Sequence, residues 1–211
     1  FIASKGKPTI IASGASSFDD VVLAVETALK VNSKICLLQC NTNYTASLEN
    51  FKYIQLNVLK AYREMFPSLV LGLSDHTPGH ATVLGAVALG ALMIEKHLTD
   101  DNDREGPDHK FSMNGDSWQD MVERTRELEN ALGNGIKRVE DNEKETVILQ
   151  RRAVCCAKDL DAGYVLTDSD LVVLRPCPPD GILPLHRNEL IGKTVSRKFT
   201  EGESFKWIDL D

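Results

Sequence analysis

The sequence predicts an α/β fold in which parallel strands alternate with helices, followed by a small module made mainly of short strands. Apolar runs alternate with amphipathic segments over roughly the first 135 residues. These runs are nearly continuous, which is typical of parallel strands covered on their outer side by helices. Beyond residue 151 the segments shorten and turn-forming residues multiply. Four strand–helix units amount to half of a closed eight-unit barrel, whereas the alternative, an open sheet, would leave apolar edge strands unpaired.

The first two strand–helix units are expected within residues 8–65. A strand is predicted at 8–12, ending at Ser13, and a helix at 18–30 with Ser17 as its candidate N-cap. A second strand at 34–39 leads into a polar loop at 40–50 and a helix from about Phe51 to Met65.

The next two units are expected within residues 69–132. Strands are predicted at 69–73 and 91–94, with a packing helix at 80–90 between them and a last helix at 117–132 stopped by Gly133. Residues 136–150 begin with a dense run of charge and are interpreted as a solvated linker. A domain boundary near residue 146 therefore separates residues 1–135 from a module at 151–211.

Two histidines follow the third and fourth predicted strands. His76 stands in Gly-Leu-Ser-Asp-His-Thr at 72–77, and His97 stands in Glu-Lys-His-Leu-Thr at 95–99. Neighbouring parallel strands end at the same edge of a sheet, where such folds bind ligands, so the imidazoles are expected to converge. Two imidazoles can hold a divalent transition metal with positions open for substrate. On spacing alone, hydrogen-bonded structural histidines are an equal alternative.

Composition narrows the class of protein. The formal net charge of −7 argues against a nucleic-acid partner. No apolar run approaches the roughly 20 residues that span a bilayer, and no signal peptide is visible. Five cysteines without zinc spacing favour free thiols in a reducing, cytoplasmic compartment, and adjacent Cys155 and Cys156 are expected to point to opposite faces of a strand. A start at Phe1 without Met predicts that the chain is a piece of something longer.

The two histidine motifs, Gly-Pro-Asp-His at 106–109 and Ser112-Met113 together resemble the sialic acid synthase family. Residues 151–193 are similar to the antifreeze-like SAF domain, a β-clip fold, that ends those enzymes. The resemblance implies the C-terminal half of a TIM (β/α)8 barrel followed by a SAF domain. It further implies a transferase that condenses phosphoenolpyruvate with the open-chain aldehyde of an N-acylated mannosamine-type sugar, giving a nine-carbon 2-keto acid and phosphate.

The resemblance also implies a metal and a phosphoenolpyruvate site. His76 and His97 match the ligands of a divalent metal, usually Mn²⁺, with Mg²⁺ or Co²⁺ as alternatives. Four further residues match the family's phosphoenolpyruvate contacts: Ser13, Thr42, Tyr44 and Ser74. Thr45 stands where the family has Pro, and Ala12 stands where many members have Ser. The match to the family is therefore weaker in these two loops than at the two histidines.

Three more residues match functional positions of the family. Asp108 is expected to act as a base or to position water near the acceptor sugar, although a loop Asp is also a common helix cap. Glu95 fills an acidic position of its motif and is expected to serve catalysis or to orient a neighbour. Asp75 is as well suited to capping its loop as to catalysis. Arg175 matches a residue that reaches the sugar in the partner subunit's barrel, which implies a domain-swapped homodimer.

Several alternatives remain open. The acceptor is either N-acetylmannosamine, giving N-acetylneuraminate, or a 2,4-diacetamido-2,4,6-trideoxyhexose, giving a legionaminate or pseudaminate. A metal hydrolase would need a third ligand, for which only His109 lies near the predicted site. A noncatalytic carbohydrate-binding or ice-binding protein would not need the histidine pair. Because the first half of the barrel, with its phosphate-neutralising lysines, is expected to lie outside this chain, the chain alone is expected neither to fold well nor to catalyse.

Overall fold

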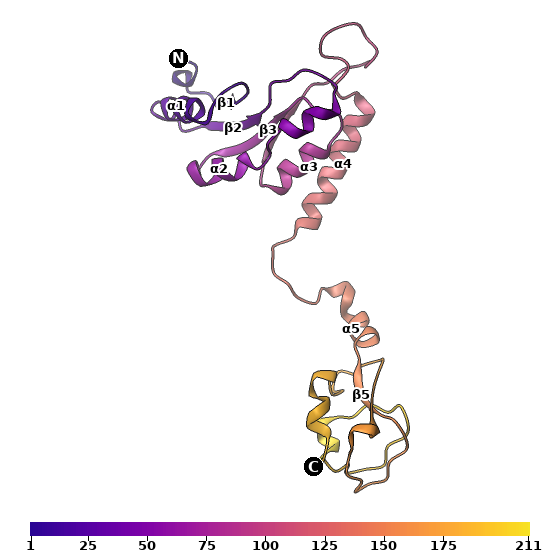
Figure 1. Cartoon of the computed structure of the whole chain (residues 1–211). Coiled ribbons are helices and arrows are strands. Elements are labelled where there is room, and N and C mark those ends of the chain that lie inside the picture. Colours follow the sequence, from indigo (N-terminus) through magenta and orange to yellow (C-terminus); the bar gives the residue numbers. More distant parts are fainter. The chain divides into compact units, whose positions relative to one another are not determined.

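A four-stranded parallel sheet forms the centre of residues Phe1–Gly135, the first of two units in the computed structural model, which describes residues 1–211 (Figure 1). The strand order is β1-β2-β3-β4, with β1 Thr9–Ala12, β2 Ile35–Cys40, β3 Val70–Asp75 and β4 Met93–Lys96. Each strand therefore pairs with the next in sequence. Right-handed crossovers in this order place the connecting helices on one face of the sheet.

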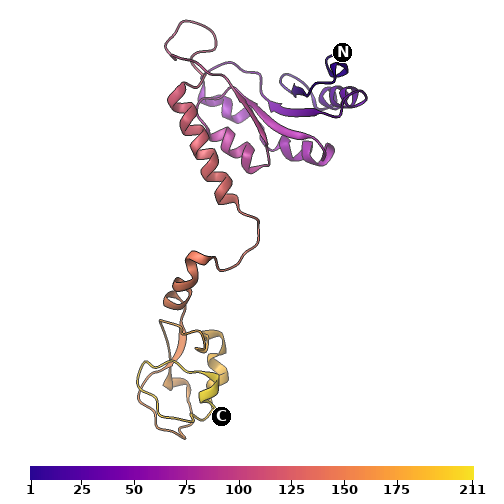
Figure 2. The ribbon, with the colours of Figure 1, turned by 180° about the vertical axis from the view of Figure 1, so that it is seen from behind.

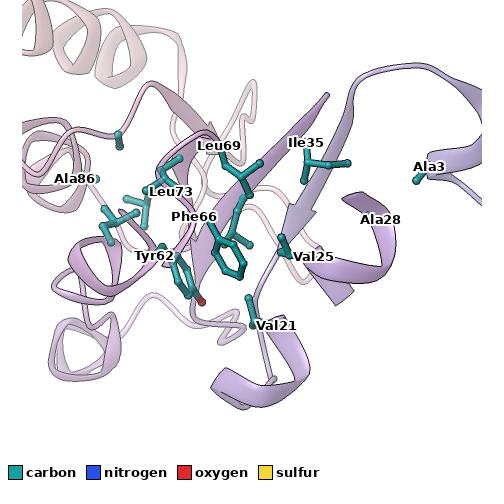
Figure 3. Packing of buried hydrophobic residues seen from close by; sticks show 14 of the residues in the cluster. Ala3, Val21, Val25, Ala28, Ile35, Tyr62, Phe66, Leu69, Leu73 and Ala86 are labelled. Atoms are coloured by element: carbon teal, nitrogen blue, oxygen red, sulfur yellow. The ribbon is translucent and has the colours of Figure 1, made fainter. Parts of the chain in front are cut away.

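The helices of this unit are α1 Phe18–Leu29, α2 Val58–Met65, α3 Ala81–Ala88 and α4 Gly115–Leu132. Helices α1, α2 and α3 bury that face of the sheet in one apolar core (Figure 3), and α4 adds a smaller cluster with Val83 and Met121. Val25 of α1 and Leu37 of β2 are fully buried in the larger core, and Tyr62 of α2 is 3% exposed. Helix α4 packs against α3, as the view from behind also shows (Figure 2). The predicted Ser17 cap is confirmed, because its hydroxyl accepts from the Asp20 N–H.

Three predicted boundaries were wrong for local reasons. The helix predicted at 51–65 is split into a 3₁₀ turn, Leu48–Tyr53, and α2, because Gln55 adopts a positive φ of 53° that no helix continues through. Strand β4 starts two residues later than expected, since the Ala91 N–H still bonds to the Ala86 carbonyl of the preceding helix end. Helix α4 starts two residues earlier, because Asn114 forms a capping box with Ser117.

Strand register decides which side chains share a face of the sheet. Cys40 lies opposite Ser74, and Ser74 lies opposite Glu95. Because side chains alternate along a strand, these three occupy the face away from the helices, whereas Asp75 and Lys96, also register partners, occupy the helix face. Gly72 permits this packing, since a Cβ there would collide with the Met93 carbonyl and the Leu38 side chain.

Both outer strands of the sheet have an unpaired edge. β1 pairs only with β2, and β4 only with β3. Ile10 on β1 is 53% exposed, and Leu92 beside β4 is 76% exposed. An apolar groove between α3 and α4, with Val83, Leu92 and Trp118 among its lining residues, adjoins the β4 edge. Apolar side chains at unpaired edges are unusual for a finished sheet.

The second unit, Ile136–Asp211, is built from short elements. Strands β5 Ala153–Cys156 and β6 Leu171–Leu174 pair antiparallel, and isolated bridges and 3₁₀ turns at Asp168–Asp170, Pro184–Leu190 and Trp207–Asp209 complete it. Cys156 faces the main core with Phe199 and Phe205, while Cys155 faces a smaller cluster, which confirms the prediction of opposite faces. All five cysteines are free.

The segment interpreted as a linker is partly helical. After the 3₁₀ turn Asp141–Glu143, helix α5 runs over Lys144–Gln150. Glu140 and Glu143 form a capping box at the start of the 3₁₀ turn, and the Ile148 carbonyl of α5 accepts from the Cys177 N–H, 3.0 Å away. Local capping and this tie to the strand module explain why residues 141–150 are ordered. No helix of either unit is both long enough and apolar enough to span a membrane.

Candidate functional site

His76 and His97 lie side by side at the carboxyl ends of β3 and β4. Each follows the last residue of its strand directly, and their ring centroids are 5.2 Å apart. His76 is buried at 5% exposure, whereas the side chain of His97 is 29% exposed. Adjacent parallel strands whose last residues are register partners therefore bring together two imidazoles that are 21 residues apart in sequence.

The tautomer of His76 is set by the backbone of the preceding strand end. Its Nδ1 lies 3.0 Å from the carbonyl oxygen of Asn41. Because a carbonyl only accepts, Nδ1 carries the proton and Nε2 is the nitrogen that keeps the lone pair. Hydrogen bonding with the Cys40 side chain raises the pKa of His76 despite the opposing effect of burial, and the Asn41 carbonyl adds to the rise.

Asp108 faces the other imidazole. The His97 Nδ1 lies 3.6 Å from Oδ2 of Asp108, whose side chain is half-exposed. A carboxylate at this position favours a proton on Nδ1, which leaves Nε2 of His97 as the potential ligand atom. The two rings thus share one arrangement, in which an oxygen acceptor lies behind each Nδ1.

Two aromatic rings pack against the histidines. Phe111, 2% exposed, lies 4.9 Å from His97 and 6.0 Å from His76 between ring centroids. The Tyr44 ring lies 4.5 Å from that of His76 and 5.8 Å from that of His97. Tyr44 was predicted as a site residue, but Phe111 was not. The one signal for Phe111 in the sequence is an apolar residue in an otherwise polar loop.

Polar side chains line the same face of the sheet below the histidines. The Ser74 hydroxyl donates to Oε1 of Glu95 over 3.0 Å, so these two predicted residues are in contact. Cys40, opposite Ser74, was not predicted. Burial acts to raise the pKa of the Cys40 thiol, but hydrogen bonds with His76, Ser74 and Thr42 outweigh it and lower the pKa. Its signal in the sequence was strand alternation, which places it on the face of Ser74.

The question left open for Asp75 is answered by its contacts. Its carboxylate accepts from the Thr77 N–H at 3.1 Å, from the Thr82 hydroxyl at 2.6 Å and from Nζ of Lys96 at 2.7 Å. All of these partners lie on the helix face, and Asp75 is 2% exposed. Asp75 therefore caps its loop and does not point toward the imidazoles.

Ser13 and Thr42 have partners other than the histidines, and Arg175 is described within its own unit. The Ser13 hydroxyl donates to Oε1 of Gln39 and accepts from the Cys40 N–H, both over 3.2 Å. Thr42 is exposed, with its hydroxyl 3.7 Å from Sγ of Cys40. Arg175 belongs to the second unit, where its Nε donates to the Gln150 carbonyl. The other histidines have their own partners: His80 with Asp120, His109 with Thr99, and His186 with Glu189.

The donor set fits a metal with few protein ligands. No group of three or more His, Cys, Asp or Glu side chains is arranged to hold a metal ion. Two imidazoles that bind through Nε2 would supply two ligands and leave the remaining positions to water or substrate oxygens. Such an open site suits Lewis-acid chemistry rather than a closed structural metal.

The first unit is a parallel α/β domain with two imidazoles at its strand ends, and the second is a small β module. Comparison with known proteins identifies the family that combines these two parts. Residues 1–137 match the NeuB family and residues 151–211 match the SAF domain. The chain belongs to the NeuB family. That match bears out the family resemblance drawn from the sequence motifs.

Characterised relatives are similar over nearly the whole chain. The N,N'-diacetyllegionaminic acid synthase of Legionella pneumophila is 33% identical over 99% of this chain and 58% of its own length. Pseudaminic acid synthase of Campylobacter jejuni is 30% identical over 99% of the chain and 59% of its own length. Human N-acetylneuraminate-9-phosphate synthase is 31% identical over 92% of the chain and 53% of its own length. The chain thus spans little more than half the length of these relatives.

Two solved structures are also similar. A Bacillus subtilis spore coat polysaccharide biosynthesis protein, spsE, aligns over all of this chain and 63% of its own with a TM-score of 0.56 and 28% identity. An N-acetylneuraminic acid synthetase from Leptospira borgpetersenii, in complex with citrate, aligns over 69% of this chain and 50% of its own with a TM-score of 0.61 and 28% identity.

Proposed function

We propose that this chain is part of an enzyme that condenses phosphoenolpyruvate with the open-chain aldehyde of an N-acylated mannosamine-type sugar. The products would be a nine-carbon 2-keto acid and phosphate. The observation that carries the proposal is the His76–His97 pair, whose Nδ1 atoms face the Asn41 carbonyl and the Asp108 carboxylate, at the two strand ends that also carry Ser74 and Glu95. The NeuB match and three relatives with synthase names support it.

His76 and His97 would hold a divalent metal, with Mn²⁺ as the first candidate and Mg²⁺ or Co²⁺ as alternatives. When bound, that ion supplies a Lewis acid that polarises the aldehyde oxygen. The Asn41 carbonyl and the Asp108 carboxylate hold the two rings with Nε2 directed away from them. Phe111 and Tyr44 restrict ring rotation by packing against the imidazole faces and edges.

The remaining residues would handle the substrates and protons. C3 of the enol phosphate attacks the aldehyde carbon, water adds at C2, and phosphate leaves with cleavage of the C–O bond. Ser74, now donating to Glu95, is placed to donate to an anionic substrate oxygen, and Glu95 to accept the proton of the attacking water. Asp108, half-exposed beside His97, is placed to position water or a sugar hydroxyl. Ser13, Thr42 and Tyr44 are proposed as further phosphoenolpyruvate contacts.

Residues 1–135 are proposed to be the C-terminal half of a TIM (β/α)8 barrel. Three features support this architecture: the progressive parallel strand order, the two unpaired strand edges, and the apolar groove between α3 and α4 beside β4. A preceding half-barrel would pair with both edges and cover that groove. It would also supply cationic groups for the phosphate, which the described site lacks within its own cluster.

Arg175 is proposed to act in a neighbouring subunit. The SAF domain matched at residues 151–211 includes Arg175, and the family resemblance implies that such a domain lies across the barrel of a partner subunit. The assembly would then be a domain-swapped homodimer in the cytoplasm. The acceptor sugar is proposed to be one of three kinds, since the relatives carry legionaminic, pseudaminic and N-acetylneuraminate-9-phosphate names.

The test is phosphate release from phosphoenolpyruvate by the protein as its gene encodes it. Mn²⁺ or a chelator is added, and N-acetylmannosamine or each 2,4-diacetamido-2,4,6-trideoxyhexose is offered. Release that needs metal and one sugar, and that is lost in His76→Ala and His97→Ala, would establish the reaction and its product. His186→Ala, whose ring pairs with Glu189, is the matched control. Absence of release with every sugar, from a folded protein that binds Mn²⁺, would refute the proposal.

A further inference from the structure

A buried ion pair lies directly behind the two histidines. The Asp75 carboxylate and the Lys96 ammonium are 2.7 Å apart, and their side chains are 0% and 1% exposed. Asp75 immediately precedes His76, and Lys96 immediately precedes His97. The pair therefore joins the last residue of β3 to the last residue of β4, on the face opposite the imidazoles.

The contacts of this pair link the two strand ends to each other and to the start of helix α3. Asp75 and Lys96 are register partners, and Nζ of Lys96 also donates to the Thr77 carbonyl over 2.6 Å. Thr77 and Thr82 fill the remaining carboxylate positions through their hydroxyls. One ammonium thus links the residues on both sides of His76 to the residue before His97.

The pair is a costly way to obtain stability alone. Removing two charges from water is expensive, and apolar residues of similar volume often serve stability as well or better. A charged pair fixes the relative orientation of its two side chains, because short charge-assisted hydrogen bonds restrict both distance and angle. Since side chains alternate along a strand, holding Asp75 and Lys96 on one face fixes His76 and His97 on the other.

We propose that Asp75 and Lys96 are positioning residues that set the separation and orientation of the His76 and His97 rings. The metal readout of this proposal rests on the proposed function, whereas the ring geometry does not. Both side chains are buried on the face away from the proposed substrate site. Their effect reaches the site through the two strand ends.

The experiment uses the protein as its gene encodes it and compares Lys96→Met, Asp75→Asn and the double variant. Each single variant leaves one buried charge unpaired, so we expect both to lose thermal stability, and the double variant to regain part of it. Mn²⁺ binding, measured by electron paramagnetic resonance below each melting temperature, is expected to be about ten- to hundredfold weaker in all three, including the double variant. Recovery of wild-type affinity together with stability in the double variant would overturn the proposal.

A measurement without metal separates the positioning role of Asp75 and Lys96 from the proposal that the histidines bind a metal. In histidine side-chain ¹H–¹⁵N spectra, we expect the His76 and His97 signals to shift in the double variant, while the His186 signal of the second unit stays in place. If wild-type protein binds no Mn²⁺ but these signals shift, the positioning role stands and the metal proposal falls. Unchanged signals would refute positioning. Val25→Ala, a core truncation in α1, is the control for lost stability and is expected to leave Mn²⁺ affinity unchanged.

Discussion

Asp170 of the second unit is expected to make the stability of that unit depend on pH. It is fully buried, its Oδ1 lies 2.7 Å from Nζ of Lys158, and its Oδ2 accepts from the Thr167 N–H and hydroxyl. Burial by itself would raise the pKa of Asp170, but the hydrogen bonds from Lys158 and Thr167 outweigh it and lower the pKa from 3.8 to about 2.

The size and sign of the effect follow from linkage. A pKa lowered from 3.8 to about 2 means that the folded unit binds this proton less tightly than the unfolded chain does. The ionised carboxylate therefore contributes about 2 kcal/mol to the free energy of unfolding above pH 4, and this is lost as the pH falls toward 2. In Asp170→Asn that contribution is absent at every pH.

The assay is urea unfolding between pH 2 and pH 6, followed by Trp207 fluorescence in a Trp118→Phe background. Comparing wild type with Asp170→Asn cancels the other carboxylates, so the difference between the two should shrink by about 2 kcal/mol from pH 6 to pH 2. Asp180→Asn is the control, because that carboxylate is 58% exposed beside Lys206 and should give a smaller change. A difference that stays constant with pH would refute the assignment.

Three further expectations concern the core, the rings and the assembly. Leu37→Ala removes a fully buried side chain from the central strand β2. The free energy of unfolding, measured with denaturant, should fall by about 2–5 kcal/mol. A loss under about 1 kcal/mol would contradict the described packing. Phe111→Leu keeps an apolar side chain but removes ring contacts worth about 0.5–1.5 kcal/mol each. Mn²⁺ affinity measured by calorimetry should therefore fall by roughly tenfold. Unchanged Mn²⁺ affinity would show that the Phe111 ring does not position the histidines. If the site is shared between subunits, inactive Arg175→Ala and inactive His76→Ala subunits should regain phosphate release when mixed, and no regain would contradict a domain-swapped dimer.

The sequence alone was sufficient for the order of the elements and for the end of the sheet that carries chemistry. Apolar runs and helical periodicity are local properties, so the strands before His76 and His97 could be recognised to within two residues. Only short-range details failed there, such as the break at Gln55, because a single positive φ leaves no mark in periodicity.

The contacts that shape the site were decided by tertiary structure. The Asn41 carbonyl behind His76, the Lys96 ammonium on Asp75 and the Phe111 ring against both imidazoles join residues from different strands and loops. Which of these meet depends on strand register, because a shift of one residue moves a side chain to the opposite face of the sheet. Register is set by packing of the whole core, with Gly72 admitting Leu38 and the Met93 backbone. Local sequence was therefore enough to predict that His76 and His97 lie at the site. Their hydrogen-bond and packing partners were determined by the free energy of the assembled sheet.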